Sequence, residues 1–95
     1  MIRAARIEDV IWRRVGDQIV VISSDGLSTH VLNSTAAFIW ESCDGTCGVD
    51  KIAQSLSEEF DVSYEEALVD ASEIIVELIS KGIMKQVEGI FDRSG

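Results

Sequence analysis

The first third of the chain alternates short β-branched runs with turn residues. Apolar residues concentrate in three runs, at 10–15, 19–22 and 27–32, and the breaks between them contain Gly16-Asp17 and Asp25-Gly26. Glycine beside aspartate between two such runs is typical of a hairpin turn, because glycine accepts the positive φ angle that tight turns require. The pattern therefore predicts a three-stranded antiparallel meander over residues 10–32, whose third strand can form a sheet edge.

The spacing of apolar residues changes to that of helices after this meander. Asn33 or Ser34 can cap a helix over residues 35–43, since both side chains carry an oxygen that accepts from the N–H groups of a first turn. Asp44-Gly45 ends this helix. Apolar residues then recur at helical spacing over residues 49–60 and predict a second helix of about three turns.

A third helix is predicted over residues 64–81. The segment Ser63-Tyr64-Glu65-Glu66 matches the capping box, in which the serine and the glutamate each satisfy the other's backbone donor. Gly82 is well placed to close the helix in a left-handed conformation. Residues 83–87 are expected to add a short strand or an extension.

The apolar face of this third helix is unusually wide. At about 100° per residue, one face carries the following residues: Tyr64, Ala67, Leu68, Ala71, Ile74, Ile75, Leu78 and Ile79. Val69 and Val76 lie beside this face, so the apolar arc spans roughly 220°, whereas a helix on one core surface needs somewhat over 100°. Either the strands and the first two helices cover both sides, or Val69, Ser72, Val76 and Ile79 line a groove that a partner fills.

Length and charge indicate one small acidic domain over residues 1–95. The chain has 95 residues, 46% of them apolar, and a formal net charge of −9. All of the excess negative charge lies in residues 34–82, the helical part. No apolar run approaches the roughly 18–20 residues of a membrane span, and the first residues lack the apolar block of a signal peptide. We therefore expect a cytoplasmic protein with a disordered end over residues 88–95.

The residue types that usually carry chemistry do not form a catalytic or metal-binding pattern. Zinc takes four ligands, and His30 is the single histidine beside Cys43 and Cys47. Two cysteines in a cytoplasmic chain are expected to be free thiols. His30 has no nucleophile at a useful spacing, and adjacent glutamates on a helix do not face each other. We therefore predict no enzyme, no metal and no cofactor.

Three strands and three helices favour an α+β fold that resembles the winged helix-turn-helix, which usually binds DNA. Residues 64–80 contain no basic residue and five acidic ones, so this helix would repel phosphates. Nucleic acid is therefore not an expected partner. An acidic regulator that binds protein or, less favourably, DNA stays open as an alternative, as does a small subunit that stabilises a neighbouring enzyme.

Several short segments together resemble the PqqD family. They are LNSTAAFIWE at residues 32–41, Asp44-Gly45, VDKIA at 49–53, Leu56, EEFDV at 58–62, Asp70-Ala71 and LISKGI at 78–83. The resemblance covers about residues 10–83 and is strongest over 32–53. Ala36, where many relatives have glycine, and Cys47 depart from the family pattern.

The resemblance implies a peptide recognition element. Such a domain binds the leader segment of a ribosomally made precursor peptide and presents the core segment to a modifying enzyme. That enzyme is often a radical SAM protein of pyrroloquinoline quinone (PQQ) biosynthesis, or a leader peptidase in lasso-peptide pathways. The leader strand typically adds to the third strand and lies against the third helix. Carried onto this chain, the implied binding residues are Leu27, Ser28, Thr29, His30, Val31 and Leu32 on the strand and Val69, Ser72, Glu73 and Val76 on the helix.

The physical properties of an edge strand agree with this implication. A free edge offers alternating N–H and C=O groups to an extended peptide, and neighbouring apolar pockets accept alternate side chains. Main-chain hydrogen bonds and a few apolar anchors stabilise the complex, and ordering the leader removes part of this free energy. We therefore expect micromolar binding. The same edge would also permit a homodimer.

Overall fold

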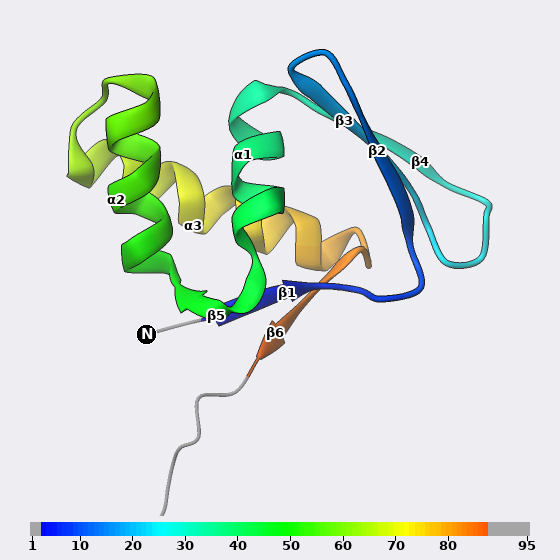
Figure 1. The fold of residues 1–95 in the computed structure, drawn as a ribbon. Coiled ribbons are helices and arrows are strands. Elements are labelled where there is room, and N and C mark those ends of the chain that lie inside the picture. The colour runs from blue at the N-terminus through cyan, green and yellow to red at the C-terminus, as the bar shows by residue number, and fades with distance from the viewer. Residues whose placement is uncertain (1–2, 88–95) are drawn as a thin grey trace, which may run out of the picture.

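A computed structural model describes residues 3–87 as three helices and six strands in two antiparallel sheets (Figure 1). In chain order the elements are β1 (Arg3–Arg6), β2 (Ile11–Val15), β3 (Gln18–Ile22), β4 (Thr29–Leu32), α1 (Ser34–Ser42), β5 (Asp44–Gly48), α2 (Val49–Phe60), α3 (Tyr64–Ser80) and β6 (Met84–Val87). The predicted α+β class, the meander and the three helices are confirmed, and β6 confirms the short strand expected after the third helix. The end expected to be disordered, residues 88–95, lies outside the described residues.

Strands β2, β3 and β4 form the predicted meander, in that order. A two-residue loop joins β2 to β3, and Gly16 adopts the positive φ angle of 64° that this loop requires. The third strand begins at Thr29, two residues later than predicted. Leu27 and Ser28 lie in the preceding turn instead, because Gly26 has a positive φ of 74° and the Leu27 N–H donates to the Asp25 carboxylate at 2.9 Å.

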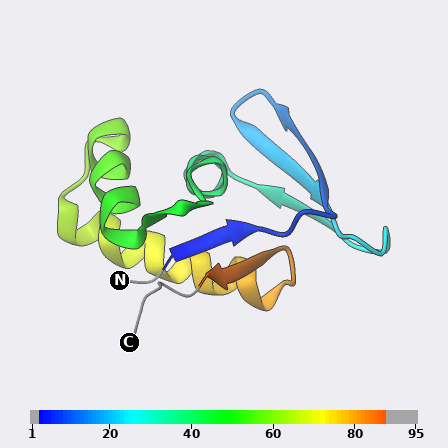
Figure 2. The ribbon, with the colours of Figure 1, turned by 60° about the horizontal axis from the view of Figure 1, so that its bottom comes forward.

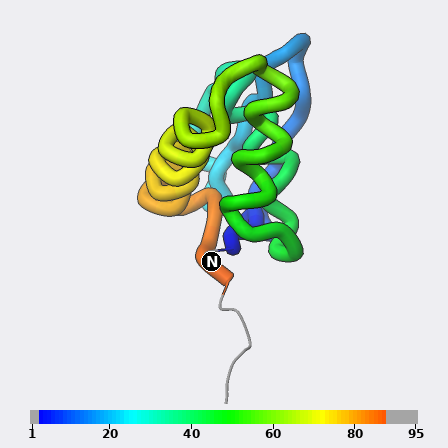
Figure 3. Tube along the Cα trace, turned by 90° about the vertical axis from the view of Figure 1, so that its left-hand side faces the viewer, coloured from blue at the N-terminus to red at the C-terminus, as the bar shows by residue number. Residues whose placement is uncertain are grey.

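The starts of α1 and α3 follow from the predicted caps. The Asn33 side chain accepts from the Ala36 N–H at 2.9 Å, and the Ser63 hydroxyl accepts from the Glu66 N–H at 3.1 Å. At the other end of α3, Gly82 adopts the predicted left-handed conformation with φ 78°. Helices α2 and α3 then pack against each other as a hairpin (Figure 3).

The second sheet was predicted only in its last strand. Its order is β5-β1-β6, so the N-terminal strand β1 lies between a segment from the middle of the chain and one that follows the last helix (Figure 2). Asp44-Gly45 was expected only to end the first helix, and no strand was predicted over residues 44–48. Their pairing with β1 makes them a strand.

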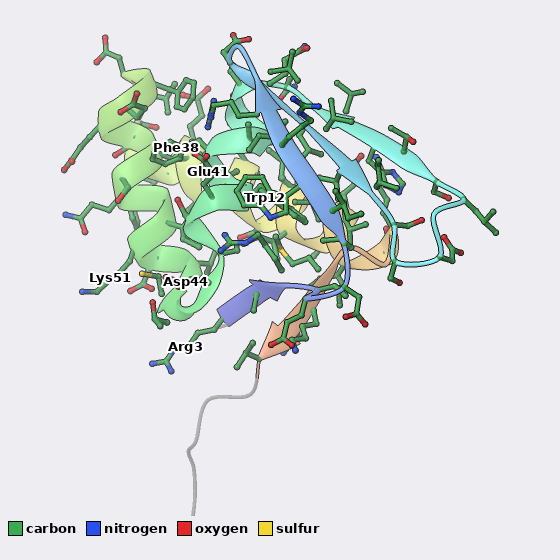
Figure 4. All side chains as sticks on the ribbon, turned by 45° about the vertical axis from the view of Figure 1, so that its right-hand side comes forward. Arg3, Trp12, Phe38, Glu41, Asp44 and Lys51 are labelled. Carbon is green, nitrogen blue, oxygen red and sulfur yellow. The ribbon has the colours of Figure 1, made fainter. Side chains whose placement is uncertain are left out.

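One core joins the meander to the helices. Ile19 and Val21 of β3 and Trp40 of α1 are fully buried, and Trp12 projects from β2 toward α1, where its ring meets Trp40 edge-on with centroids 6.0 Å apart (Figure 4). Strand β2 is otherwise exposed along its whole length. None of the helices within residues 3–87 is long and apolar enough to cross a membrane.

Candidate peptide-binding groove

Strand β4 forms one edge of the meander sheet. Within residues 3–87 it pairs only with β3, in the register Ile19↔Leu32, Val20↔Val31, Val21↔His30 and Ile22↔Thr29. Its other edge therefore carries backbone groups that no described strand uses. This free edge is the feature that strand addition requires.

The register identifies which backbone groups of β4 point outward. The Ser23 N–H donates to the Ser28 C=O at 2.9 Å, so this pair is a hydrogen-bonded one. Hydrogen-bonded pairs alternate along an antiparallel ladder, so His30 and Leu32 also direct their backbone groups toward β3. The N–H and C=O groups of Thr29 and Val31 consequently point to the free edge.

A tight turn positions the start of this edge. The Asp25 carboxylate accepts from the Ser23 hydroxyl and from the Leu27 N–H, and both hydrogen bonds hold the pKa of Asp25 below its usual value. The Ser23 hydroxyl in turn accepts from the Ser28 N–H at 3.1 Å. This network of side-chain and backbone bonds fixes the path of the chain into Thr29.

A pocket of about 140 Å³ lies between β4 and α3. We call it the β4 groove, and its lining residues are Val31, Leu32, Asn33, Ala36, Ile74, Glu77, Leu78 and Lys81. Its walls come from the end of β4, the start of α1 and the C-terminal half of α3. At its rim the Lys81 ammonium lies 3.2 Å from the Glu77 carboxylate. A strand added to β4 would place alternate side chains against Ile74 and Leu78.

The structure brings only part of the predicted site together. Val31 and Leu32 line the β4 groove, whereas Ser72 and Val76 line a different pocket with Val49 and Ile79. On a helix of 3.6 residues per turn, Ser72 and Val76 lie nearly opposite the flank that faces β4. The sequence implied a single surface, and the helix phase divides it into two.

The remaining predicted residues lie in several environments. Val69 and Glu73 are exposed on α3, and neither lines the β4 groove. The four helix residues that do line it, Ile74, Glu77, Leu78 and Lys81, were not predicted as site residues. Ile74 and Leu78 were assigned to the apolar face, and only the crossing direction of α3 determines which flank of that face meets β4.

His30 is directed to the inner face of the sheet. Its cross-strand neighbour is the buried Val21, and paired residues of an antiparallel ladder share a face. Its Nε2 atom is buried and has no hydrogen-bond partner within the described chain. The residue therefore packs beneath the edge strand and contributes no backbone group to the free edge.

The two cysteines differ in their surroundings. Cys43 is buried at the end of α1, and this burial raises the pKa of its thiol to about 12. Cys47 lies half-buried in β5. Both are free, and residues 3–87 contain no group of three or more potential metal ligands.

We expect Cys43 to resist alkylation at pH 8 in the folded protein, while Cys47 reacts, because the thiolate is the nucleophile. The pKa of Cys43 is higher folded than unfolded, where it is about 8.5. Its contribution to stability is therefore complete below about pH 8.5 and falls progressively toward pH 12. The alkylation of each thiol is measured by mass spectrometry after iodoacetamide treatment, with and without urea. A Cys47→Ser variant is the control. Equal labelling of both thiols in the folded state would contradict it.

Comparison with known families identifies the chain. A family model described as coenzyme PQQ synthesis protein D (PqqD) matches residues 18–84, which is more than half of the sequence. The chain belongs to the PqqD family. The matched residues run from β3 into β6, so PqqD membership covers the β4 groove and all three helices. The comparison with curated proteins gives no match.

Solved structures share the fold. TbiB1 in complex with the TbiA(beta) leader peptide has a TM-score of 0.76 at 17% identity, over 93% of this chain and 99% of that one. Lasso peptide synthetase B1 complexed with the leader peptide gives 0.77 at 19%, over 87% and 98%. The PqqD truncation of Methylobacterium extorquens PqqCD, a stand-alone recognition element for ribosomally synthesised and modified peptides, gives 0.71 at 20%, over 86% and 87%. At these identities the likeness establishes the fold.

Proposed function

We propose that this protein is a non-catalytic adaptor that binds the leader segment of a ribosomally made precursor peptide. The observation that carries the proposal is the free edge of β4, whose outward Thr29 and Val31 groups lie beside a groove walled by α3. Membership of the PqqD family supports it, as do two structures of the same fold that were solved with leader peptides. The leader would enter as a fourth strand next to β4.

The expected affinity follows from this geometry. The N–H and C=O groups of Thr29 and Val31 offer four hydrogen bonds, each worth about 1 kcal/mol net. Two or three aliphatic side chains in and beside the groove add about 2 kcal/mol each. Ordering the leader costs about 2–5 kcal/mol, and the loss of translational freedom adds a further cost. From a gross gain of about 8–10 kcal/mol, micromolar binding, which needs about 8 kcal/mol, is therefore the tightest result expected.

The adaptor acts, we propose, in the cytoplasm with a peptide-modifying enzyme. A radical SAM protein of the PQQ pathway and a leader peptidase are the two enzyme classes to test. The adaptor holds the leader, and the enzyme acts on the core segment that continues from it. A homodimer through β4 would compete with the leader for the same edge.

A titration monitored by nuclear magnetic resonance tests the binding site. The candidate leader, taken from a short reading frame beside the gene, is added to ¹⁵N-labelled protein. We expect the largest shifts at the amides of Thr29 and Val31 and at Ile74, Leu78 and Lys81, because these residues form the edge and the groove. The β2 edge of the same sheet serves as an internal control.

Two results would contradict the proposal. Saturable shifts confined to Val49–Phe60 on addition of duplex DNA would favour the acidic regulator. Shifts of the β4 amides that depend on protein concentration and not on peptide would indicate a homodimer through that edge. In the second case the leader would have no free strand to join.

A further inference from the structure

A second apolar surface lies on α3, on the flank away from β4. Val69 and Val76 are 56% and 64% exposed, although both are aliphatic residues in the middle of a helix. Beside them is a pocket of about 90 Å³ lined by Val49, Ser72, Ile75, Val76, Ile79 and Gln86, which are almost all apolar where they face it. We call Val69, Ser72, Val76 and this pocket the valine face.

The valine face and the β4 groove can be occupied at the same time. The helix phase places Ser72 and Val76 about 140–180° around α3 from Ile74 and Lys81, at about 100° per residue. The buried residues Ala71 and Ile75 lie between the two flanks. A strand bound at β4 would therefore leave the valine face open to solvent.

The valine face has an acidic border. Residues three or four apart on a helix are neighbours, so Glu65, Glu66 and Glu73 adjoin Val69, and Glu73 also adjoins Val76. All three glutamates are exposed. The nearest bases along the chain are directed elsewhere: Lys81 pairs with Glu77 at the β4 groove, and Lys85 alternates with Gln86 in β6 and so points to the opposite side of that strand.

We propose that the valine face docks a lysine- or arginine-rich surface of the peptide-modifying enzyme, with an aliphatic side chain of the enzyme filling the pocket. This inference rests on the proposed adaptor function, since it supplies the second binding surface that an adaptor needs. At about 30 Å³ per water molecule the pocket has room for about three, which matches one aliphatic side chain. Opposite charges at the border would guide the encounter and select the partner.

A second copy of this chain fits the valine face poorly. In a twofold dimer the same surface meets itself, so Glu65, Glu66 and Glu73 would face their own copies. Each chain also carries a net charge of −9. A basic partner would attract these glutamates, whereas a second copy would bring like charges together.

The test measures enzyme binding and leader binding separately. The probe is the purified modifying enzyme whose gene adjoins that of the adaptor, and its Kd is measured by biolayer interferometry. The Kd of a fluorescein-labelled leader is measured by anisotropy. We expect both the Val69→Ser/Val76→Ser variant and the Glu65→Lys/Glu73→Lys variant to bind the enzyme at least about tenfold more weakly. Leader binding should change less than about twofold.

Matched controls separate this effect from general surface damage. Val15 is 55% exposed on β2, so Val15→Ser removes an equally exposed valine far from α3. Glu58→Lys/Glu59→Lys makes the same charge change on α2. Both controls should bind the enzyme as the unchanged protein does. Thermal unfolding confirms that each variant is folded.

The outcomes distinguish this inference from the proposed function. The valine face is not the docking site if the leader binds to the adaptor but the enzyme does not. The same holds if the enzyme binds both α3 variants as tightly as the unchanged protein. Self-association that the valine substitutions abolish would assign the face to a second copy. A variant ending at Val87 tests whether residues 88–95 occupy the valine face. Tighter enzyme binding by this variant, together with changed amide chemical shifts at Val69 and Val76, would assign the face to those residues. Failure of the leader itself to bind would instead overturn the adaptor function.

Discussion

Proline at position 31 is expected to weaken leader binding by about 30- to 1,000-fold without unfolding the domain. The Val31 N–H points to the free edge, so its removal costs the β3–β4 ladder no hydrogen bond. The loss falls on the incoming strand. One of its carbonyls loses its donor, and the proline ring occupies the space that this carbonyl would enter. Together these effects are worth about 2–4 kcal/mol, at about 1.4 kcal/mol per tenfold change.

The backbone of β4 can accept this change. Proline is tolerated on edge strands when its nitrogen faces away from the sheet, and the preceding residue, His30, already has the extended conformation that proline demands. Leader affinity is measured by fluorescence anisotropy, and stability by urea denaturation. The expected signature is a large loss of affinity with a small change in the denaturation midpoint.

Two further variants control for the side chain and for the ladder. Val31→Ala keeps the N–H donor and should lose less than about tenfold in affinity, since the Val31 side chain is 63% exposed. His30→Pro removes a donor that points to β3, so it should lower stability before it lowers affinity. Equal loss of leader affinity in folded variants at positions 29, 30 and 31 would contradict strand addition, which depends on alternate residues.

Local signals explain the parts of the fold that the sequence predicted. The β2–β3 loop needs a positive φ angle at Gly16, and the caps need the oxygen atoms of Asn33 and Ser63. Each of these requirements is met within a few residues of the chain. The meander and the helix starts were therefore predictable to within one or two residues.

Contacts between distant segments account for what was missed. Strand β5 pairs with β1 about forty positions earlier, and its Gly45 has a φ angle of 91° with no apolar alternation around it. A similar limit applies to the groove. Periodicity identified an apolar arc on α3 that is too wide for the core, but it could not assign Ile74 to the β4 flank and Val76 to the other. That assignment depends on the angle at which α3 crosses the sheet.

Helix α3 thus separates two surfaces with different chemistry. Toward β4 it offers a groove with a paired lysine and glutamate beside unsatisfied backbone groups. On its other flank it offers exposed valines within a glutamate border. The first surface suits an extended chain that supplies its own hydrogen bonds, and the second suits a folded, basic surface. The acidic composition of residues 34–82 argues against DNA binding and is consistent with peptide binding at the β4 groove and with a basic partner at the valine face.

Replacing Arg6 by alanine is expected to cost about 2–4 kcal/mol of unfolding free energy. Arg6 lies on β1, yet its guanidinium donates to the C=O groups of Trp40 at 2.8 Å and Glu41 at 3.1 Å, at the end of α1. It also lies 5.5 Å from the centre of the Trp12 ring on β2. Hydrogen bonds from a charged donor contribute about 1.5–3 kcal/mol. The cation–π contact and the helix dipole each add about 0.5–1 kcal/mol.

This one side chain joins the second sheet to α1 and to the meander. Helix α1 has no basic residue in its last turn, so Arg6 supplies the cation that its final carbonyls lack. For a domain of 95 residues, whose total stability is about 5–14 kcal/mol, the expected loss lowers the Tm by about 8–30 °C. Urea denaturation measures the free energy, and calorimetry measures the Tm.

Two comparisons show whether the geometry or the charge of Arg6 matters. Arg6→Lys keeps a cation near the helix end but loses the planar group that reaches two carbonyls and lies over Trp12, so we expect an intermediate loss. Arg13→Ala removes an exposed arginine of β2 and should change stability by less than about 0.5 kcal/mol. If Arg6→Ala costs no more than Arg13→Ala, the Arg6 guanidinium does not contribute measurably to joining the second sheet to α1 and the meander.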